Sequence, residues 1–351
     1  MSGWPRDRGG DRPALSGHMW ELSLKLRTPF VNANGEVAVR RVVILSIGDG
    51  SVAGWGEAAP YPGVTPDTVD DAWDTLQRGS VLAPSAAAAV DEALADLDGR
   101  RSGRPLWRAI GGSRPRIPTS IAVGLEEDPV ERVETTGAAG VKIKIRPGRD
   151  VSRVAAVRAA FSDLPIGVDA NGSYRWEDRR SLLQLDDHGI GYIEQPFSPG
   201  DLGSHARLRD EIVAAVVLDE PIDSTASAIA AIEADAADVL AVKPSRLGMG
   251  TAMSIHDIAL AAGLRIKASG LIETEIGRAF ALAIATLPAA AHSDIAASSW
   301  YLVGGVEAPQ PFSSGGQLVA SERPGIGLEP DPRVFERYVV RESALGSRIW
   351  D

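Results

Sequence analysis

A charged residue recurs at nearly constant spacing through the middle of the chain. The intervals between successive members of this series are 25, 25, 25 and 24 residues. Each member ends or follows a short apolar, largely β-branched run. Such a spacing suits one strand, one helix and two loops, so it predicts successive βα units of a barrel, with strand ends converging on one pocket. The members are Lys144, Asp169, Glu194, Asp219 and Lys243.

The residue types in this series indicate metal-dependent proton transfer. Asp169, Glu194 and Asp219 offer only oxygen donors, which suit Mg²⁺, and Mn²⁺ can substitute for it. The chain has no cysteine, and no histidine shares the spacing, which disfavours zinc. A desolvated lysine beside a divalent cation can act as a base near neutral pH. We therefore expect Lys144 and Lys243 to be catalytic lysines on opposite sides of the metal.

Bulk properties exclude several classes of protein. The 351 residues are enough for a barrel of about 250 residues and a further domain. A net charge of −11 argues against nucleic-acid binding, which relies on a basic face. The longest apolar stretch, residues 279–291, is too short to span a membrane. The first 18 residues lack the apolar core of a signal peptide. We expect a cytoplasmic enzyme that acts on a small molecule.

The order of predicted elements changes near residue 115, from strands followed by helices to a repeated strand, loop and helix. Residues 1–18 are expected to be a mobile tail, and residues 19–115 an α+β capping domain. Residues 116–310 are expected to form the βα-barrel, and residues 311–351 to return to the capping domain.

Local patterns predict the elements of both domains. Asn34-Gly35 and Asp49-Gly50 favour turns between strands, and Thr65-Pro66 is typical of a helix start. In the capping domain we expect strands at Met19–Leu26, Val37–Ile47 and Ser51–Glu57, then helices starting at Thr65 and spanning Ala86–Leu97. Barrel strands are expected to begin near Thr119, Val141, Ile166, Tyr192, Ala215, Val239, Leu264 and, as a weak eighth, Ser293.

Seven motifs cover nearly the whole chain after the tail. They are Trp55-Gly-Glu-Ala58, Leu106-Trp-Arg-Ala-Ile-Gly-Gly112, Val141-Lys-Ile-Lys144, Asp169-Ala-Asn-Gly172, Ile193-Glu-Gln-Pro196, Leu218-Asp-Glu220 and Lys243-Pro-Ser-Arg246. This set resembles the enolase superfamily, in its muconate-lactonising-type subgroup. The resemblance implies an α/β fold, a modified TIM barrel with an α+β capping domain and a mobile loop near Gly35. It also implies Mg²⁺ on the three carboxylates and removal of a proton α to a substrate carboxylate.

Two late motifs narrow the resemblance. Residues 267–279 and 294–301 are similar to segments of the o-succinylbenzoate synthases and N-succinylamino acid racemases. Ser269 and Trp300 depart from those segments, and Pro221 follows Asp219-Glu220 where serine is usual. Similarity to the synthases implies a lyase of menaquinone biosynthesis. It would convert 2-succinyl-6-hydroxy-2,4-cyclohexadiene-1-carboxylate to o-succinylbenzoate by syn-dehydration, with Lys144 as acid and base and Lys243 stabilising the enediolate.

Three alternatives stay open. An N-succinylamino acid racemase would use both lysines as bases. A dipeptide epimerase normally carries an Asp-x-Asp motif at the last strand, of which only Asp294 is present here. An inactive barrel that serves as a binding protein is the non-enzymatic alternative, although all five residues of the series are retained. Further residues are expected to bind substrate or support the lysines: Lys142, Asn171, Glu220, Arg246, Ser269, Gly270 and Ile272.

Overall fold

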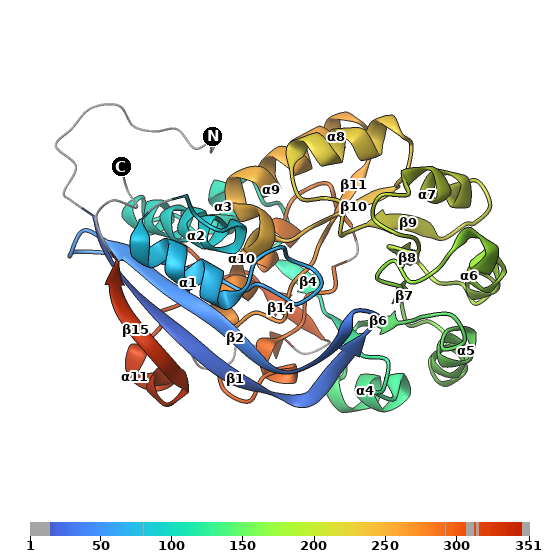
Figure 1. Cartoon of the computed structure of the whole chain (residues 1–351), viewed down its shortest axis with the longest axis horizontal. Helices are drawn as coiled ribbons and strands as arrows, with labels where there is room; N and C mark the ends of the chain where they lie inside the picture. The colour runs from blue at the N-terminus through green and yellow to red at the C-terminus, as the bar shows by residue number, and fades with distance from the viewer. Residues whose placement is uncertain (1–14, 80, 292, 307–311, 314–315, 346–351) are drawn as a thin grey trace.

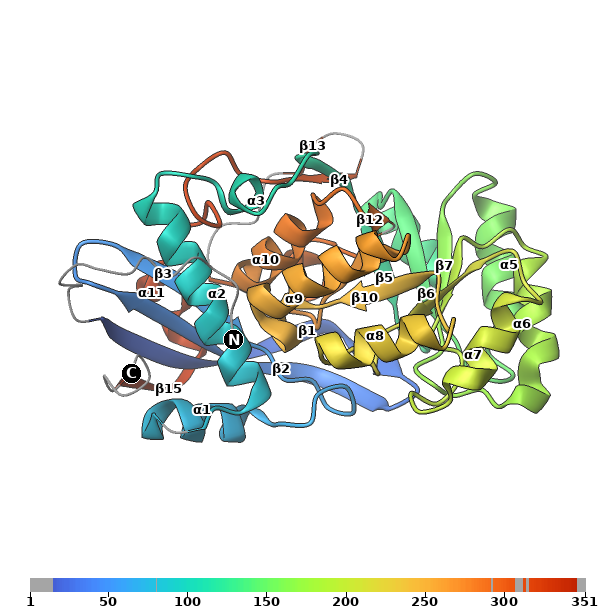
Figure 2. The same cartoon turned by 90° about the horizontal axis from the view of Figure 1, so that it is seen from above.

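The computed structural model describes residues 15–79, 81–291, 293–306, 312–313 and 316–345. An antiparallel sheet with two helices stands beside a curled parallel sheet whose outer side carries further helices (Figures 1 and 2). This arrangement confirms the prediction of an α/β barrel fold with an α+β capping domain. None of the described helices is long and apolar enough to cross a membrane.

The capping domain is built on an antiparallel sheet of order β15-β1-β2-β3. Its main feature is the long hairpin of β1 and β2, whose tip reaches the barrel, where the Leu125 N–H donates to the Val31 carbonyl at 2.7 Å (Figure 1). The elements are β1 (Ser16–Asn32), β2 (Gly35–Gly48), β3 (Ala53–Ala58), β15 (Val339–Leu345), α1 (Val69–Arg78), α2 (Pro84–Arg101) and α3 (Leu106–Ala109).

Two details of this domain differ from the sequence prediction. Strand β1 begins at Ser16, inside the segment expected as a tail, and residues 1–14 lie outside the described residues. Helix α1 begins at Val69, because Thr68 forms a capping box with Asp71. The hydroxyl of Thr65 instead accepts a hydrogen bond from the Tyr61 N–H at 2.9 Å, so the predicted helix start at Thr65 is wrong.

Eight parallel strands form the barrel sheet in sequential order from β12 to β5. The Ser120 N–H donates to the Ile295 carbonyl at 3.3 Å and so brings the first strand to the segment after the last. The eighth strand lies at Ala290–Ala291, earlier than the prediction near Ser293. The strands are β5 (Ser120–Val123), β6 (Gly140–Lys144), β7 (Ile166–Asp169), β8 (Tyr192–Glu194), β9 (Ala215–Leu218), β10 (Val239–Val242), β11 (Arg265–Ala268) and β12 (Ala290–Ala291).

Helices follow most of these strands and cover the outer side of the sheet (Figure 2). They are α4 (Pro129–Thr136), α5 (Val151–Ala160), α6 (Arg179–Asp186), α7 (Leu202–Arg209), α8 (Thr225–Glu233), α9 (Pro244–Ala261) and α10 (Glu275–Ala285). In the C-terminal part, β14 pairs with β4 below the barrel and β15 pairs with β1 in the cap. The remaining elements are β4 (Arg116–Pro118), β13 (Phe312–Ser313), β14 (Gln317–Val319) and α11 (Pro332–Phe335), with short 3₁₀ turns at Trp176–Asp178, Ser298–Trp300 and Glu336–Tyr338.

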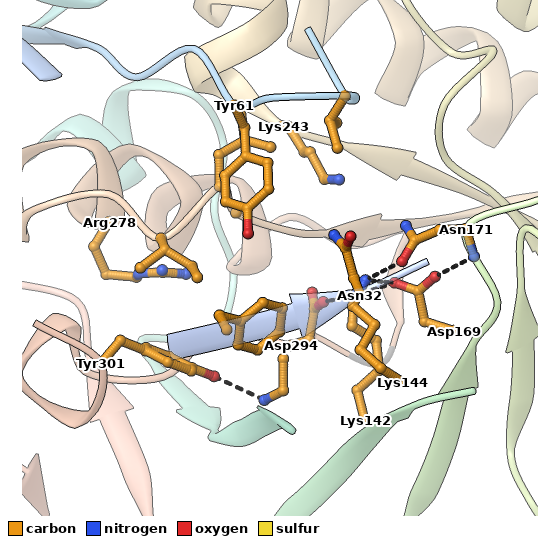
Figure 3. A pocket seen from close by; sticks show the side chains of 16 residues that line it. Asn32, Tyr61, Lys142, Lys144, Asp169, Asn171, Lys243, Arg278, Asp294 and Tyr301 are labelled. Atoms are coloured by element: carbon orange, nitrogen blue, oxygen red, sulfur yellow. Dashed lines mark hydrogen bonds and ion pairs between the residues drawn. The ribbon is translucent and has the colours of Figure 1, made fainter. Parts of the chain in front are cut away.

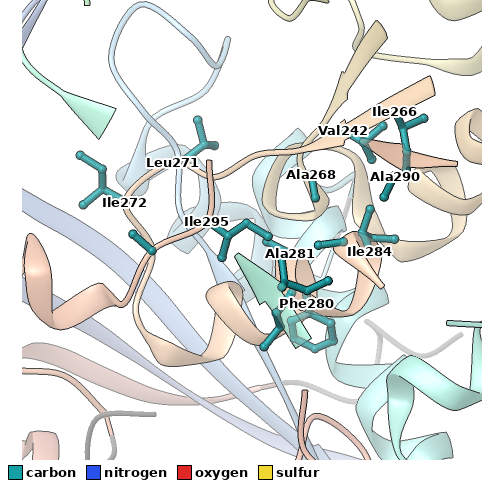
Figure 4. Packing of buried hydrophobic residues seen from close by; sticks show 14 of the residues in the cluster. Val242, Ile266, Ala268, Leu271, Ile272, Phe280, Ala281, Ile284, Ala290 and Ile295 are labelled. Atoms are coloured by element: carbon teal, nitrogen blue, oxygen red, sulfur yellow. The ribbon is translucent and has the colours of Figure 1, made fainter. Parts of the chain in front are cut away.

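Alternation along each strand separates the core from the site. On β6, Val141 and Ile143 belong to the main apolar core, whereas Lys142 and Lys144 line the pocket. On the far side of the barrel from β6, Val242 and Ile266 belong to the same apolar cluster as Ile284 of α10 (Figure 4). The helices thus cover the apolar face. The interior of the barrel holds the charged side chains besides a small apolar cluster of Tyr192, Val217, Val239 and Ala241.

Buried Glu57 joins the capping domain to the barrel. It lies on β3, and its carboxylate accepts hydrogen bonds at the start of α10 from the Thr274 N–H at 2.9 Å, the Thr274 hydroxyl at 2.6 Å and the Gly277 N–H at 2.9 Å. Burial raises the pKa of Glu57 to about 7, although these three donors oppose the rise. The contact fixes the cap above the barrel end where the charged residues lie.

Candidate active site

The five residues of the periodic series come together at the C-terminal ends of five neighbouring strands. Lys144, Asp169 and Glu194 are the last residues of β6, β7 and β8, and the ladder pairs Lys144 with Asp169 and Asp169 with Glu194. Asp219 and Lys243 directly follow β9 and β10. All five side chains are buried. The two lysines therefore stand four strands apart, with the three carboxylates on the strands between them.

Each outer carboxylate contacts a lysine. The Lys144 ammonium donates to Asp169 at 2.6 Å and to the Asn171 side-chain oxygen at 2.7 Å (Figure 3). The Lys243 ammonium donates to Asp219. Burial alone would raise the pKa of Asp219, but Lys243 and Arg246 lower it to about 2. Both carboxylates are therefore held in their ionised form.

A second layer of charge lies beneath the strand ends. The Lys142 ammonium is 2.9 Å from Glu194 and also contacts Asp294. Lys267 is fully buried and lies 2.5 Å from Glu194 and 3.1 Å from Asp294. Burial and the charge of Asp169 raise the pKa of Glu194 to about 7, while the two lysines oppose this rise. The two lysines thus do not fully offset the effect of burial and of Asp169 on Glu194.

The donor set fits a hard divalent cation. Asp169, Glu194 and Asp219 supply carboxylate oxygens from adjacent strands, as Mg²⁺ requires. Among the described residues, however, no three acidic, histidine or cysteine side chains stand together as a ready cation cage. The ammonium groups of Lys144 and Lys243 lie against two of the three carboxylates, so binding of a cation would require these lysines to turn toward the pocket.

The cap and the last barrel loops form the rest of the pocket wall. Phe30 and Asn32 come from the end of β1, and Tyr61 and Val64 from the segment after β3. Arg278 and Tyr301 line the side remote from Lys144 (Figure 3). The cavity between these groups is only about 60 Å³, whereas ligand pockets typically measure about 300–1,000 Å³. A substrate-sized ligand therefore requires the covering residues to move apart.

The predicted supporting residues occupy different places. Asn171, Gly270 and Ile272 line the pocket together with Lys142. The Asn171 amide donates to Glu220 at 2.9 Å, so Glu220 holds Asn171 from behind. These residues extend the site beyond the strand ends.

Two further supporting residues act from outside the pocket lining. Arg246 is buried and donates to the Asp219 carbonyl at 2.8 Å and to its carboxylate at 3.2 Å. Ser269 lies beneath the pocket, where its hydroxyl accepts a hydrogen bond from Lys267 at 3.2 Å. Arg246 is therefore a contact of Asp219, and Ser269 is part of the lower charged layer.

Sequence reasoning gave no role to several residues that the fold brings here. Asn32 and Tyr61 belong to the capping domain, outside the barrel period. Lys267 lies within β11, one residue before the end of the strand, so the pattern of charged residues at strand ends does not include it. Only the mixture of charge and apolar residues in Arg265-Ile-Lys-Ala268 could have indicated a buried cation.

Comparison with known proteins matches both domains to one family. The family model described as "Enolase C-terminal domain-like" matches residues 125–334. The model for the N-terminal domain of mandelate racemase and muconate lactonizing enzyme matches residues 62–111. The chain belongs to the enolase superfamily. This confirms the resemblance drawn from the seven sequence motifs.

Superfamily members that are similar to this chain are named for different enzymatic activities. An o-succinylbenzoate synthase of Bacillus subtilis is 31% identical over 358 residues, covering 92% of this chain and 96% of the relative. An N-succinylamino acid racemase of Thermus thermophilus is 35% identical over 265 residues, covering 73% of this chain and 72% of the relative. A solved structure of a probable mandelate racemase from Alicyclobacillus acidocaldarius has a TM-score of 0.83 and 30% identity, covering 95% and 99% of the two chains. These relatives are enzymes, but their names differ, so the superfamily alone does not fix the reaction.

Proposed function

We propose that this enzyme is an o-succinylbenzoate synthase that dehydrates 2-succinyl-6-hydroxy-2,4-cyclohexadiene-1-carboxylate. The observation that carries the proposal is a pocket with cationic groups at both ends. Lys144 and Lys243 flank the strand-end carboxylates, and Arg278 lines the remote side. A substrate with two carboxylates suits such a pocket, because one can lie beside the lysines and the other near Arg278. The similarity to a named synthase over 92% of the chain supports the same choice.

The remote end has free hydrogen-bonding capacity. Arg278 is buried and forms an ion pair with Glu273 at 3.0 Å. Its Nε and the hydroxyl of Tyr61 have no hydrogen-bond partner among the described residues. Buried donors without partners are costly, and a substrate carboxylate would satisfy them. We infer that the succinyl carboxylate binds at this end.

Asp169, Glu194 and Asp219 would hold Mg²⁺, which when bound supplies positive charge beside the ring carboxylate of the substrate. Lys144 removes the proton on the carbon α to that carboxylate. The electron pair of the broken C–H bond forms the new ring double bond, and the neighbouring C–O bond breaks. Lys144 then returns the proton to the departing hydroxyl, which leaves as water, and Lys243 stabilises the negative charge on the carboxylate during the step.

Racemisation of N-succinyl amino acids is the second candidate. It is favoured by the positions of Lys144 and Lys243, which stand four strands apart with the three carboxylates between them. A racemase must remove a proton from one face and deliver one to the opposite face. Two lysines on opposite sides meet this need, and the similarity to a named racemase supports it. Both reactions use the same groups, so one enzyme can catalyse both.

The test compares both reactions in one preparation. Purified enzyme with Mg²⁺ is given the cyclohexadiene substrate, and formation of o-succinylbenzoate is followed by ultraviolet absorbance. N-Succinyl amino acids of each hand are incubated separately in D₂O, and loss of the α-proton signal is followed by NMR. We expect rapid dehydration. Racemisation requires both lysines, so Lys144→Ala and Lys243→Ala should each exchange the α-proton of one enantiomer only.

Exposed Lys25 on β1 offers a matched control, since Lys25→Ala removes an ammonium group far less buried than the two site lysines. This variant should keep both activities. If the wild-type enzyme forms no o-succinylbenzoate but exchanges both enantiomers, the racemase proposal replaces the synthase proposal. If a single lysine variant exchanges both enantiomers, the opposed two-base geometry is wrong.

A further inference from the structure

Arg40 is a buried arginine of the capping domain with no part in the proposed chemistry. It lies on β2 and is only 2% exposed. Its neighbour Arg41 points to the other face of the strand, where it pairs with Glu21 and Asp70. Burying a guanidinium is costly unless its donors are satisfied. The groups to which Arg40 donates hydrogen bonds therefore indicate its role.

The guanidinium of Arg40 binds backbone carbonyls from both domains. It donates to Pro60 at 2.8 Å and to Ala59 at 3.1 Å in the cap segment that follows β3. It also donates to the Ile272 carbonyl at 3.4 Å in the barrel loop between β11 and α10. The Arg40 guanidinium carbon lies 4.9 Å from the centre of the Tyr61 ring. One side chain thus joins two segments that both line the pocket.

Ile272 holds a strained backbone conformation at this junction. Its φ angle is +58°, in the left-handed region. A β-branched residue there is a true outlier, because its side chain crowds the backbone. Such strain persists only where the surroundings enforce it, and it gathers at ligand sites. Ile272 lines the pocket, so its strained backbone directs a side chain toward the substrate.

The loop around Ile272 leaves it little freedom. A Cβ atom on Gly270 would lie 2.6 Å from both the Arg278 guanidinium and the Glu273 carboxylate, so Arg278 packs directly on the backbone. The Leu271 N–H donates to Glu273 at 2.6 Å. These contacts fix the residues before Ile272. The described side chain that binds the Ile272 carbonyl is Arg40.

We propose that Arg40 is a positioning residue that locks the cap segment at Tyr61 and the strained Ile272 into one substrate-facing wall. Arg40 is not one of the described residues that line the pocket. It acts through Tyr61 and Ile272, which by the proposed function would contact the part of the substrate remote from the reacting carbon. This specificity role rests on the proposed function, whereas the mechanical coupling between Arg40 and Ile272 does not.

A double-mutant cycle in the full chain tests the coupling without any assay of activity. The variants are Arg40→Lys, Ile272→Gly and the two combined, and the readout is the midpoint of urea denaturation. Lysine keeps the charge but cannot reach three carbonyls from a planar group. Glycine adopts a positive φ without strain. Relief of left-handed strain corresponds to a factor of about 5–30 in the folded-to-unfolded ratio.

If Arg40 enforces the strain at Ile272, Arg40→Lys lets that strain relax in the wild-type background, which offsets part of the lost hydrogen bonding. The midpoint should therefore fall by less in the wild-type background than in the Ile272→Gly background, where there is no strain to release. Equal losses in the two backgrounds would overturn the coupling. If Arg40→Lys alone does not fold, the same cycle is run with Arg40→Gln, and the two losses are compared in the same way. Arg158→Lys is the control, because Arg158 also binds backbone carbonyls but lies on α5, away from the cap. The fall in the urea midpoint that Arg158→Lys causes should be the same in the wild-type and Ile272→Gly backgrounds.

Kinetics test the specificity role separately. Arg40→Lys should raise KM for the succinyl substrate by about tenfold and change kcat much less, because the lysines and carboxylates are untouched. A fall in kcat with unchanged KM would overturn the positioning role. If the wild-type enzyme dehydrates no substrate, the proposed function fails, while the urea cycle still decides whether Arg40 enforces the backbone of Ile272.

Discussion

The substitution Glu57→Gln should change how stability depends on pH. Burial raises the pKa of Glu57 from 4.5 to about 7. Between these values the folded chain keeps a proton on Glu57 that the unfolded chain has lost. The stability that this group contributes is therefore full below pH 4.5, and it falls as pH rises toward 7. The change corresponds to roughly 3 kcal/mol in the free energy of unfolding. Glutamine does not titrate, so this component should vanish.

The assay is urea denaturation of both proteins at several pH values from about 4.5 to 8, a range that spans both pKa values of Glu57. Glutamine places an amide donor among the three donors at the start of α10, so the variant should be less stable by about 1–3 kcal/mol at low pH. The gap between the two proteins should then close as pH rises. Glu134→Gln, an exposed site on α4, is the control. If the wild-type and Glu57→Gln curves run parallel over the whole range, the assignment of a raised pKa to Glu57 is wrong.

Three further outcomes follow from the site. Chelation should abolish activity and added Mg²⁺ or Mn²⁺ should restore it, while Asp169→Asn, Glu194→Gln and Asp219→Asn should each weaken metal binding in calorimetry; full activity without metal would contradict the site assignment. Lys243→Arg should retain a trace of dehydration, about 10²–10³-fold below wild type, because Lys243 acts by its charge; an undiminished rate would remove Lys243 from the mechanism. Gly270→Ala should lower thermal stability and raise KM, since its Cβ would lie 2.6 Å from Arg278 and Glu273; unchanged values would show that this loop yields easily.

The barrel and its strand-end residues could be predicted from the sequence because the βα unit imposes a period. Each unit places its chemistry at the same point of the repeat, so Asp169 and Glu194 could be assigned to adjacent strand ends without a structure. The weak eighth strand was misplaced, since Ala290–Ala291 has neither the length nor the β-branched residues that mark a strand.

Other parts of the site could not be predicted, because long-range packing places them. Tyr61 reaches the pocket from the capping domain, which folds over the barrel through contacts such as that of Glu57, and Arg40 binds backbone carbonyls beside it. Lys267 is buried among carboxylates that come from other strands. From the sequence alone, a lysine within a strand is expected to be exposed to solvent. Helix α1 begins at Val69 because Thr68 forms the capping box with Asp71, while the hydroxyl of Thr65 is engaged by the Tyr61 N–H. The local sequence offers both threonines as caps and does not show which one is used.

The most direct test of the central claim is dehydration by the Lys144→Ala enzyme. Both proton movements of a syn elimination occur on one face, so the account assigns them to Lys144. With Mg²⁺ and the cyclohexadiene substrate, the wild-type enzyme should form o-succinylbenzoate rapidly. Lys144→Ala, folded and still able to bind metal, should form none above the uncatalysed rate. A substantial rate of o-succinylbenzoate formation by Lys144→Ala would show that the base lies elsewhere and would contradict the account.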